Sequence, residues 1–429
     1  MQNSNTLWSN VTKTRVPHAS LKNEHQANIA IIGGGFTGLS TALHLLDGEQ
    51  SVTLIEAAEI GFGASGRNSG QVIPTMSGTE PDVIIKKHGE AGVRFAKLIA
   101  SSAHYLFDLV KRENIACEAE QNGWFQPAHT SGRLSLSRKR VESWSKLGGK
   151  VSLLNAKSSA ELIGSDQWHG GLLCHSGGHI NPLALVHGLA EKVTQRGCQI
   201  FENTPALTLN KVKSKWHIKT TEGFIVADKV LLATNAYTDQ FEQNLHPKQS
   251  RSIIPVTTYQ MATEPLDKNL RKTILPQNHA VSDTRGDLRF FRWDKRNRLI
   301  TGGALIYQAS AETRLKKIIG ERLNQTFHKL GTPKFDYIWS GRIGMTADRI
   351  PRFYSPEPGL WSWTACNGRG IALSITLGNV FAKALTGTPI NELAIPITPI
   401  RPYPLHAIGK EVAPKLLAYY RWRDNREVA

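Results

Sequence analysis

The spacing of apolar residues predicts a strand, a turn and a helix near the start of the chain. Residues 28–32 (NIAII) form a short β-branched apolar run, and the glycine-rich residues 33–38 (GGGFTG) follow at once. An apolar series with helical spacing comes next, at Leu39, Ala42, Leu43 and Leu46. A second apolar run, residues 51–56 (SVTLIE), predicts a neighbouring strand that ends on Glu56. This order of elements is typical of a dinucleotide-binding unit.

Each glycine of the turn has a physical role in such a unit. Gly33 permits the tight turn, Gly35 lets the backbone approach a pyrophosphate, and Gly38 lets the helix pack closely on the strand. With Phe36 and Thr37, they place a helix N-terminus against the phosphates. Glu56, followed by Ala57, is expected at the ribose, where its carboxylate would repel a 2′-phosphate. NADP is therefore disfavoured, whereas FAD and NAD both remain open.

A glycine-rich loop after Glu56 favours a flavin over a nicotinamide. A nicotinamide-binding unit more often runs straight into its next helix, whereas residues 61–70 contain four glycines. Such a loop offers a closely approaching backbone and anion-binding N–H groups. A mobile surface loop is the alternative. The cofactor contacts expected here are Gly63, Ala64, Ser65, Arg67, Asn68, Ser69 and Gly70.

A second glycine turn lies near the far end of the chain. Residues 361–387 predict a strand, a turn and an amphipathic helix. The helix N-terminus, with Arg369 nearby, is suited to stabilise negative charge on a reduced flavin. An ordinary strand-to-helix connection is the alternative. Arg369 is also predicted to have a catalytic role, and the cofactor contacts expected in this turn are Asn367, Gly368, Arg369, Gly370 and Ile371.

Length and composition narrow the class of protein. The 429 residues suggest two or three domains. The net charge of +17 indicates attraction to anions, but no nucleic-acid-binding motif accompanies it, so a nucleic-acid partner is not predicted. The four cysteines are scattered without a C-x-x-C pair, so no metal site is predicted. No signal peptide or membrane-length apolar run is found, and a cytoplasmic location is expected.

The motifs together resemble the D-amino-acid oxidase and glycine oxidase superfamily of FAD-dependent amine oxidoreductases. The segments that carry the resemblance are residues 28–46, 52–71, 177–190, 229–238, 339–353 and 367–373. The resemblance implies an α/β fold with a discontinuous Rossmann-like FAD-binding domain (25–80, 165–240 and 340–390). A sheet-based α+β substrate domain (81–164 and 241–339) and a C-terminal tail (391–429) complete the chain. Ala206, Ala233 and Thr234 are further expected cofactor contacts. In the substrate domain, residues 281–305 are expected to form a strand pair around 294–297.

The resemblance also implies an activity. The expected substrate is an amino acid or a gamma-glutamyl polyamine derivative, whose C–N bond is oxidised by hydride transfer to flavin N5. The imine then hydrolyses, and oxygen or another acceptor reoxidises the flavin. The alternatives are a flavin-dependent hydroxy-acid or quinone-linked dehydrogenase and a non-catalytic flavin-binding protein.

Departures from the family pattern limit what is carried over. Residues 341–351 lack the cysteine that attaches flavin in one branch, so non-covalent FAD is expected. Residues 299–305 lack that branch's oxygen-activating lysine, so oxidase and dehydrogenase both stay open. Arg369 stands where similar proteins have a histidine, which leaves the substrate open.

Single residues supply further hypotheses. The candidate carboxylate clamps are Arg369, which is favoured, Arg342 and Arg349. An aromatic pocket could use Trp124, Tyr259, Trp293 or Trp339, although core packing is favoured for each. Packing or turn roles are expected for His44, His175 and His179. Residues 416–423 (LLAYYRWR) predict a basic, aromatic helix that packs on its own domain, with a membrane surface or a partner as the alternative.

Overall fold

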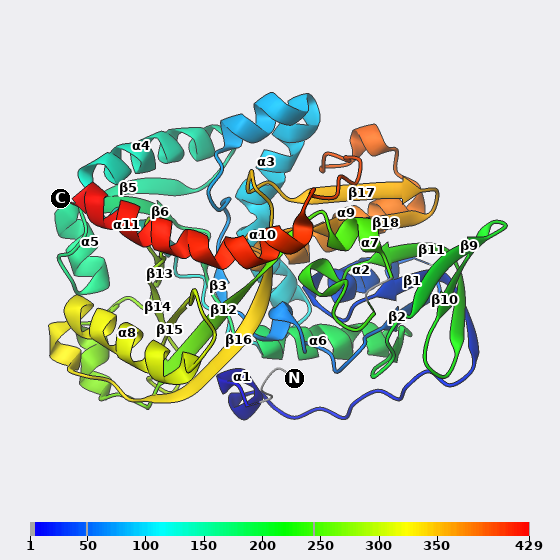
Figure 1. Ribbon diagram of the computed structural model, residues 1–429, viewed down its shortest axis with the longest axis horizontal. Coiled ribbons are helices and arrows are strands. Elements are labelled where there is room, and N and C mark those ends of the chain that lie inside the picture. Colours follow the sequence, from blue (N-terminus) through cyan, green and yellow to red (C-terminus); the bar gives the residue numbers. More distant parts are fainter. Residues whose placement is uncertain (1–4, 49, 243–244, 429) are drawn as a thin grey trace.

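Two eight-stranded sheets, each with its own helices, organise the chain (Figure 1). The computed structural model describes residues 5–48, 50–242 and 245–428. The first sheet has the strand order β17-β18-β11-β1-β2-β8, with β10 and β9 joined to β11. The second has the order β16-β12-β15-β14-β13-β4-β6-β5. The predicted α/β fold class is confirmed.

The first sheet has a parallel centre. Its strands are β1 (Glu24–Ile32), β2 (Val52–Ile55), β8 (Gln199–Phe201), β11 (Phe224–Leu232) and β18 (Leu360–Thr364), with β17 (Arg352–Glu357) antiparallel at one edge. An antiparallel meander of β9 (Thr208–Val212) and β10 (Lys215–Lys219) joins the first half of β11. Alternate residues of β1 are buried in different cores: Ile29 and Ile31 under the helices, Ala30 and Ile32 on the other face.

Four helices cover one face of this sheet: α2 (Phe36–Leu45), α3 (Pro81–Arg112), α6 (Pro182–Gln195) and α9 (Ile371–Thr386). The predicted helices after both glycine turns are therefore confirmed. Helices α2 and α9 cross closely, and Ser40 Oγ donates to the Ile375 carbonyl at 2.7 Å. A Cβ on Gly378 would lie 2.2 Å from Ser40 Oγ, so this crossing needs a glycine.

The second sheet is mostly antiparallel. Its strands are β4 (Trp124–Pro127), β5 (Val151–Asn155), β6 (Gly170–Cys174), β12 (Ile254–Thr263), β13 (Ala280–Ser282), β14 (Phe290–Trp293), β15 (Leu299–Gly303) and β16 (Phe335–Met345). Strands β14 and β15 pair antiparallel, which confirms the strand pair expected around residues 294–297. Helices α4 (Ser131–Lys146), α5 (Ala156–Ile163) and α8 (Ala311–Thr326) lie around this sheet (Figure 1).

Three segments lie in, or pack against, a different sheet from the one expected from their predicted domain. Helix α3, expected in the substrate domain, buries Phe95 and Ile99 in the core beside the first sheet. Strand β6 and the whole of β16 pair in the second sheet, although residues 165–240 and 340–390 were assigned to the first domain. Apolar spacing identifies the buried face of an element but not the sheet that covers it. The division into two domains stays a prediction.

The chain ends occupy separate places (Figure 1). Near the N-terminus, α1 (Leu7–Val11) precedes an extended segment that leads into β1. At the other end, α10 (His406–Val412) and α11 (Leu416–Val428) form a helical segment across the front of the molecule.

Two smaller features complete the fold. A two-stranded sheet joins β3 (Gln71–Val72) to β7 (Gly178–His179), and the short helix α7 (Pro247–Ser250) precedes β12.

The C-terminal helix packs on its own chain, as expected. Leu417 and Asp424 are buried, and the Asp424 carboxylate accepts from the N–H groups of Gly286 and Asp287, both at 3.0 Å. Trp422 on the same helix is 51% exposed, and docking of that face on a membrane or partner stays a prediction. None of the helices within the three described ranges combines the length and apolar character that a membrane crossing requires.

Candidate functional site

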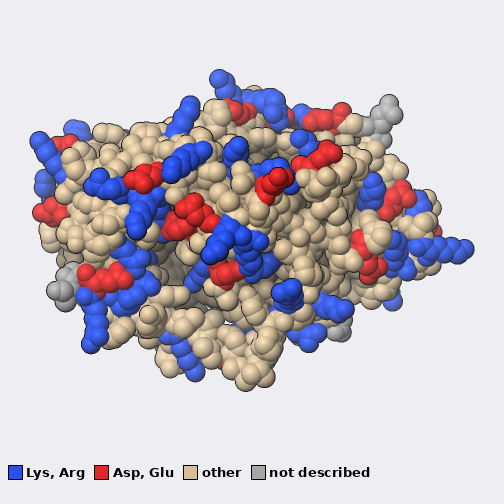
Figure 2. Space-filling model, turned by 90° about the horizontal axis from the view of Figure 1, so that it is seen from above, with Lys and Arg blue, Asp and Glu red and all other residues tan. Residues whose placement is uncertain are grey.

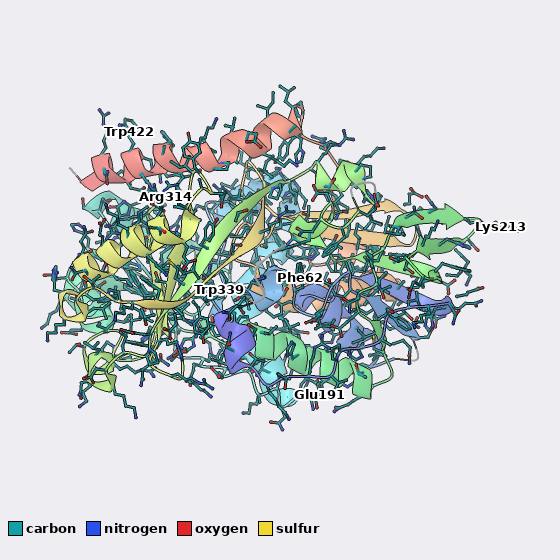
Figure 3. The ribbon with its side chains drawn as sticks, turned by 60° about the horizontal axis from the view of Figure 1, so that its bottom comes forward. Phe62, Glu191, Lys213, Arg314, Trp339 and Trp422 are labelled. Atoms are coloured by element: carbon teal, nitrogen blue, oxygen red, sulfur yellow. The ribbon has the colours of Figure 1, made fainter. Side chains whose placement is uncertain are left out.

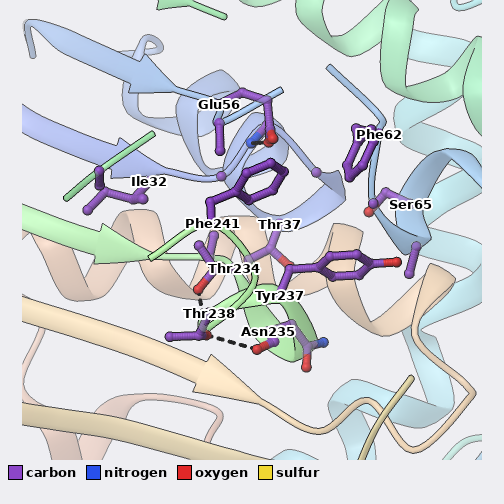
Figure 4. Close-up of a pocket in the computed structure, with 18 of the residues that line it drawn as sticks. Ile32, Thr37, Glu56, Phe62, Ser65, Thr234, Asn235, Tyr237, Thr238 and Phe241 are labelled. Atoms are coloured by element: carbon purple, nitrogen blue, oxygen red, sulfur yellow. Dashed lines mark hydrogen bonds between the residues drawn. The ribbon is translucent and has the colours of Figure 1, made fainter. Parts of the chain in front are cut away.

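Two adjoining cavities lie at the carboxyl ends of the first sheet's parallel strands, where α/β sheets bind ligands. The first cavity lies between the β1–α2 turn, the end of β2 and the short helix η2 (Asn235–Tyr237) (Figure 4). The second cavity lies between the glycine-rich loop, strands β12 and β16, and the start of α9. The residues that line both are Phe36, Ala64, Ser65, Asn235 and Ser374. The two cavities therefore lie on either side of a shared set of residues.

The β1–α2 turn leaves no room for side chains at its glycines. Gly33 has a φ of 117°, and its Cβ would lie 3.0 Å from the Ala233 carbonyl oxygen. A Cβ on Gly35 would lie 2.8 Å from Ser65 Oγ, and one on Gly38 would lie 2.1 Å from the Gly33 oxygen. Gly33, Gly35, Phe36 and Thr37 line the first cavity, whereas Gly38 supports the turn from behind. The open backbone here forms a cradle suited to a diphosphate.

Glu56 and Ala57 line the first cavity at the end of β2, where a ribose was expected (Figure 4). The Glu56 carboxylate accepts from the Gly34 N–H at 2.7 Å and from the Ala58 N–H at 3.1 Å. Burial raises the pKa of Glu56, while these hydrogen bonds act in the opposite direction. The carboxylate thus joins the end of β2 to the glycine turn. Gly34 was not among the predicted contacts, although it also lines this cavity.

The glycine-rich loop is ordered by the Asn68 side chain. Asn68 Nδ2 donates to the carbonyls of Ala64 at 3.0 Å and Ser65 at 2.9 Å, and Oδ1 accepts from the Gly70 N–H at 2.9 Å. These bonds fix the short helix η1 (Ala64–Gly66) and the turn after it. The alternative of a mobile surface loop is therefore not favoured.

Most of the predicted contacts in and near this loop line the site. They are Gly63, Ala64, Ser65, Ala206, Ala233 and Thr234 in the first cavity, and Ala64, Ser65, Arg67, Asn68 and Ser69 in the second. Gly70 lines neither cavity. It has a φ of 79°, and its Cβ would lie 2.2 Å from the Ile180 carbonyl oxygen, so it serves the turn itself.

The start of α9 faces the second cavity. Gly368, Gly370 and Ile371 line it, and the helix presents its N-terminal amides there. Asn367 does not line it. Its Oδ1 instead accepts from the Thr346 N–H at 2.9 Å, and its Nδ2 donates to the Ala365 carbonyl at 2.8 Å.

Arg369 is directed away from both cavities. Its guanidinium donates to Thr75 Oγ1 at 2.5 Å and to the Met76 carbonyl, and it lies 4.8 Å from the centroid of the Trp124 ring. Burial lowers the pKa of Arg369 to about 9. A contact with substrate or flavin would require these bonds to break, so the geometry does not favour the predicted catalytic role, the role as carboxylate clamp or the cofactor contact of this side chain.

The other two candidate clamps also have other surroundings. Arg349 Nη2 donates to the Tyr420 hydroxyl at 3.1 Å. Arg342 lines the second cavity, and its backbone N–H donates to the Tyr237 hydroxyl at 3.0 Å. Side chains alternate along a strand, so the Arg342 side chain leaves β16 on the face opposite to that of Ile343.

The four aromatic candidates are packing residues, as favoured from the sequence. None of them is among the described residues that line the two cavities. Each donates a hydrogen bond within the protein: Trp124 to the Ser282 hydroxyl, Trp293 to the Ile274 carbonyl, Trp339 to the Arg67 carbonyl and Tyr259 to the Gln308 side chain.

The histidines have structural partners as well, which agrees with the expected packing or turn roles. His44 bonds to the Tyr105 hydroxyl at 2.6 Å, and His175 bonds to the Ser152 hydroxyl at 2.9 Å. Burial lowers the pKa of His179 to about 3.

Gln260 of β12 is a site residue that the sequence analysis missed. It lines the second cavity with Thr258, two residues earlier on the same strand face. Its Oε1 is buried and has no hydrogen-bond partner among the described residues. Buried polar groups are almost always bonded, so this oxygen is a candidate for contact with a ligand.

Asn235 and Tyr237 of η2 were also missed. Asn235 Oδ1 accepts from the Ala365 N–H at 3.0 Å, which joins the end of β11 to the end of β18. A polar residue three positions after an apolar strand was the available signal for Asn235. Gln260 had no local signal, because it is one of several polar residues in a mixed strand.

The second cavity has few groups able to exchange protons. Among the described residues that line it there is no Asp, Glu, His or Lys, and its titratable members are Arg67, Arg342 and Cys366. Burial raises the pKa of the Cys366 thiol. The described residues that line this cavity therefore include no carboxylate–imidazole or carboxylate–lysine pair.

Comparison with known proteins agrees with this geometry. Residues 28–384 match the family model described as "DAO: FAD dependent oxidoreductase". The gamma-glutamylputrescine oxidoreductase of Escherichia coli (strain K12) is 31% identical over 390 residues, which cover 90% of each chain. In fold, the chain is similar to L-amino acid deaminase from Proteus vulgaris (TM-score 0.72, 21% identity, 91% of this chain and 95% of that chain). It is also similar to glycine oxidase from Geobacillus kaustophilus (TM-score 0.70, 19% identity, 85% and 96%). The chain therefore belongs to the DAO family of FAD-dependent oxidoreductases.

Proposed function

We propose that this FAD-dependent oxidoreductase oxidises the C–N bond of an amine or amino acid that binds in the second cavity. The observation that carries the proposal is the unpartnered Gln260 Oε1 in a cavity that adjoins the cofactor cradle. A carboxamide accepts from an amino group and donates to a carboxylate, so it suits a substrate that bears both.

The residues of the first cavity fit FAD. A Cβ on Gly33 or Gly35 would clash with the Ala233 carbonyl oxygen or with Ser65 Oγ, so the turn keeps a bare backbone beside the first cavity, which suits a diphosphate. The Glu56 carboxylate lines the same cavity and is suited to accept from ribose hydroxyls. The N-terminus of α9 supplies positive potential at the second cavity. When bound, FAD supplies the electron acceptor for the oxidation. Non-covalent attachment is part of the proposal, and the raised pKa of Cys366 supports it because a thiol is a poor nucleophile.

The chain's own residues prepare the substrate rather than react with it. Gln260 is proposed to accept a hydrogen bond from the amino group. The positive charges of Arg67 and Arg342 disfavour a nearby ammonium and so favour the neutral amine that the oxidation needs. With no carboxylate, imidazole or lysine among the described residues lining the second cavity, the ammonium proton is released to solvent.

The substrate class is supported from two directions. The relative named gamma-glutamylputrescine oxidoreductase suggests a gamma-glutamyl amine, and the net charge of +17 favours a substrate that carries a carboxylate. Oxygen or another acceptor then reoxidises the cofactor, and a cytoplasmic location remains part of this proposal.

The test is anaerobic addition of gamma-glutamylputrescine, sarcosine, glycine, several D- and L-amino acids and a set of 2-hydroxy acids to the holoenzyme. We expect one of these amines to bleach the visible absorbance of the oxidised flavin. If 2-hydroxy acids bleach the flavin and none of the amines does, the protein oxidises hydroxy acids and the proposed substrate class is wrong. Bound FAD that no donor reduces would indicate a non-catalytic flavoprotein.

A substitution tests the role of Gln260 separately. Gln260→Met keeps the volume and removes the hydrogen bond, so we expect kcat/KM to fall by about 10- to 100-fold with unchanged FAD affinity. Gln308→Met is the matched control, because Gln308 lines neither cavity and bonds to Tyr259. Equal kcat/KM values in both variants would show that Gln260 does not contact the substrate.

A further inference from the structure

The N-terminal arm, residues 5–18, contacts the glycine-rich loop although it lies outside the family match of residues 28–384. We name residues 57–70 the cofactor loop. Trp8 of α1 and Trp339 of β16 meet edge to face beside this loop, with ring centroids 6.3 Å apart. Figure 3 shows Trp339 next to α1 and Phe62 of the loop close by. The arm, near the start of the chain, and β16, more than 300 residues later, thus both contact this loop.

Three consecutive carbonyls at the end of the cofactor loop each accept a hydrogen bond from a buried side chain of another element. The pairs are Trp339 Nε1 to the Arg67 carbonyl at 2.7 Å, Trp8 Nε1 to the Asn68 carbonyl at 2.9 Å and Arg292 Nε to the Ser69 carbonyl at 2.5 Å. The donors come from β16, the arm and β14. The orientation of three successive peptide groups is therefore set by groups outside the loop.

The three donors also pack on one another. The Arg292 guanidinium lies 5.0 Å from the centroid of the Trp8 ring, within the range of a cation–π contact. Trp8, Trp339 and Arg292 are each no more than 2% exposed. Loss of one of these hydrogen bonds would cost free energy, because water cannot reach the buried carbonyl to replace the donor.

The arm holds the beginning of the loop through Glu202. This buried carboxylate accepts from the Ile60 N–H of the loop at 2.5 Å, from the His18 N–H of the arm at 2.6 Å and from the Arg15 guanidinium. Burial alone would raise the pKa of Glu202, but these bonds together lower it, so the carboxylate is ionised. The arm and the loop share this charged anchor.

The bond from Trp8 also determines where a neighbouring N–H points. In a trans peptide, the carbonyl and the following N–H point in opposite directions. Because the Asn68 carbonyl points to Trp8, the Ser69 N–H points away from it. Ser69 lines the second cavity, and its N–H has no acceptor among the residues that the structure describes. This N–H is therefore available to a bound ligand.

We infer that the N-terminal arm is a strap that holds the cofactor loop in the conformation that binds FAD, with Trp8 as a positioning residue. The inference rests on the cofactor site of the proposed function. It goes beyond that function, because it assigns a role to a segment that precedes the dinucleotide-binding unit.

The experiment compares Trp8→Phe with Trp422→Phe. The first keeps an aromatic ring and removes the N–H donor, and the second removes an indole from an exposed position on the C-terminal helix. Hydrogen exchange of residues 57–70 is measured in the apoprotein, and FAD affinity is measured by fluorescence titration. For Trp8→Phe we expect faster exchange in residues 57–70, unchanged exchange in β2 and α9, and a Kd for FAD raised about tenfold. Trp422→Phe should leave all of these unchanged.

A second variant keeps the inference testable if Trp8→Phe folds poorly. Glu202→Gln preserves shape, removes the shared charge, and should increase exchange at the Ile60 end of the loop. If both variants keep the wild-type rate of hydrogen exchange in the loop and the wild-type affinity for FAD, the inference that the arm is a strap is wrong. Failure of the wild-type protein to bind FAD would instead refute the proposed function, while the exchange measurement would still test the contact between arm and loop.

Discussion

At the scale of residues, the arginines differ from the expectation drawn from their positions in the sequence. Arg369 was the favoured clamp because it lies in the second glycine turn, yet its guanidinium is held by Thr75 and Met76. A long side chain can leave a cofactor turn in either direction, and its direction depends on tertiary partners. Arg342 lines the cavity, but alternation along β16 directs its side chain to the face opposite to that of Ile343.

A substitution distinguishes the two contributions of Arg342. Arg342→Met should lower kcat/KM by less than tenfold, because alternation along β16 directs the side chain to the face opposite to that of Ile343, where we expect it to supply only long-range charge. Arg349→Met, whose guanidinium bonds to Tyr420, should have no effect on KM. Steady-state kinetics with the best amine decides. A loss of 100-fold or more in Arg342→Met would identify it as a direct carboxylate clamp.

The pH dependence also belongs to single residues. Since no described residue lining the second cavity titrates near neutral pH, kcat/KM should rise with pH until the substrate amine is neutral, at about tenfold per pH unit below the pKa of the amine. The profile should move when substrates with different amine pKa values are compared. Cys366→Ala should not change it, because burial keeps the Cys366 pKa above its ordinary value. A single pKa shared by all substrates would point instead to an enzyme group.

At the scale of elements, the β1–α2 turn was predictable because its geometry is local. Gly33, Gly35 and Gly38 are close in sequence. A Cβ added to any of them would clash within the turn or with a neighbouring strand or loop. The helix after the second turn was predictable for the same reason. Gln260 was not, since it enters the site only through the pairing of β12 with β16, which no short stretch of sequence specifies.

The turn allows a direct test. Gly38→Ala introduces a Cβ 2.1 Å from the Gly33 carbonyl oxygen, so α2 must move away from β1. We expect the free energy of unfolding to fall by about 1–3 kcal/mol, as is typical of overpacked sites, and FAD binding to weaken. Gly48→Ala, whose Cβ would meet only the Leu45 carbonyl oxygen at 3.7 Å, is the control. Unfolding in urea and FAD titration give both quantities, and equal behaviour of the two variants would contradict this account of the turn.

At the scale of the whole molecule, we consider the charge of the surface. Figure 2 shows lysines and arginines over the visible face with acidic residues among them, and the net charge is +17. The fold class was predictable because the motifs in the sequence resemble those of a family whose fold is known. The layer membership of α3, β6 and β16 was not, because it depends on long-range packing.

The net charge predicts a salt effect on substrate capture. For a substrate with net negative charge, such as glutamate, kcat/KM should fall a few-fold between about 0.01 M and 0.15 M salt, as screening shortens the reach of the positive field. For its neutral isostere glutamine, kcat/KM should stay nearly constant, and kcat should be unaffected for both. Initial-rate measurements at several salt concentrations check this. Equal salt effects on the two substrates would exclude a steering role for the net charge.

The most direct test of the central claim combines cofactor identification with anaerobic reduction in one sample. The purified holoenzyme is denatured to identify the released flavin, and a parallel sample is titrated with the amine panel without oxygen. The account predicts that denaturation releases FAD completely and that at least one amine reduces it. A protein that neither carries nor takes up FAD, or whose FAD no amine reduces, would contradict the account.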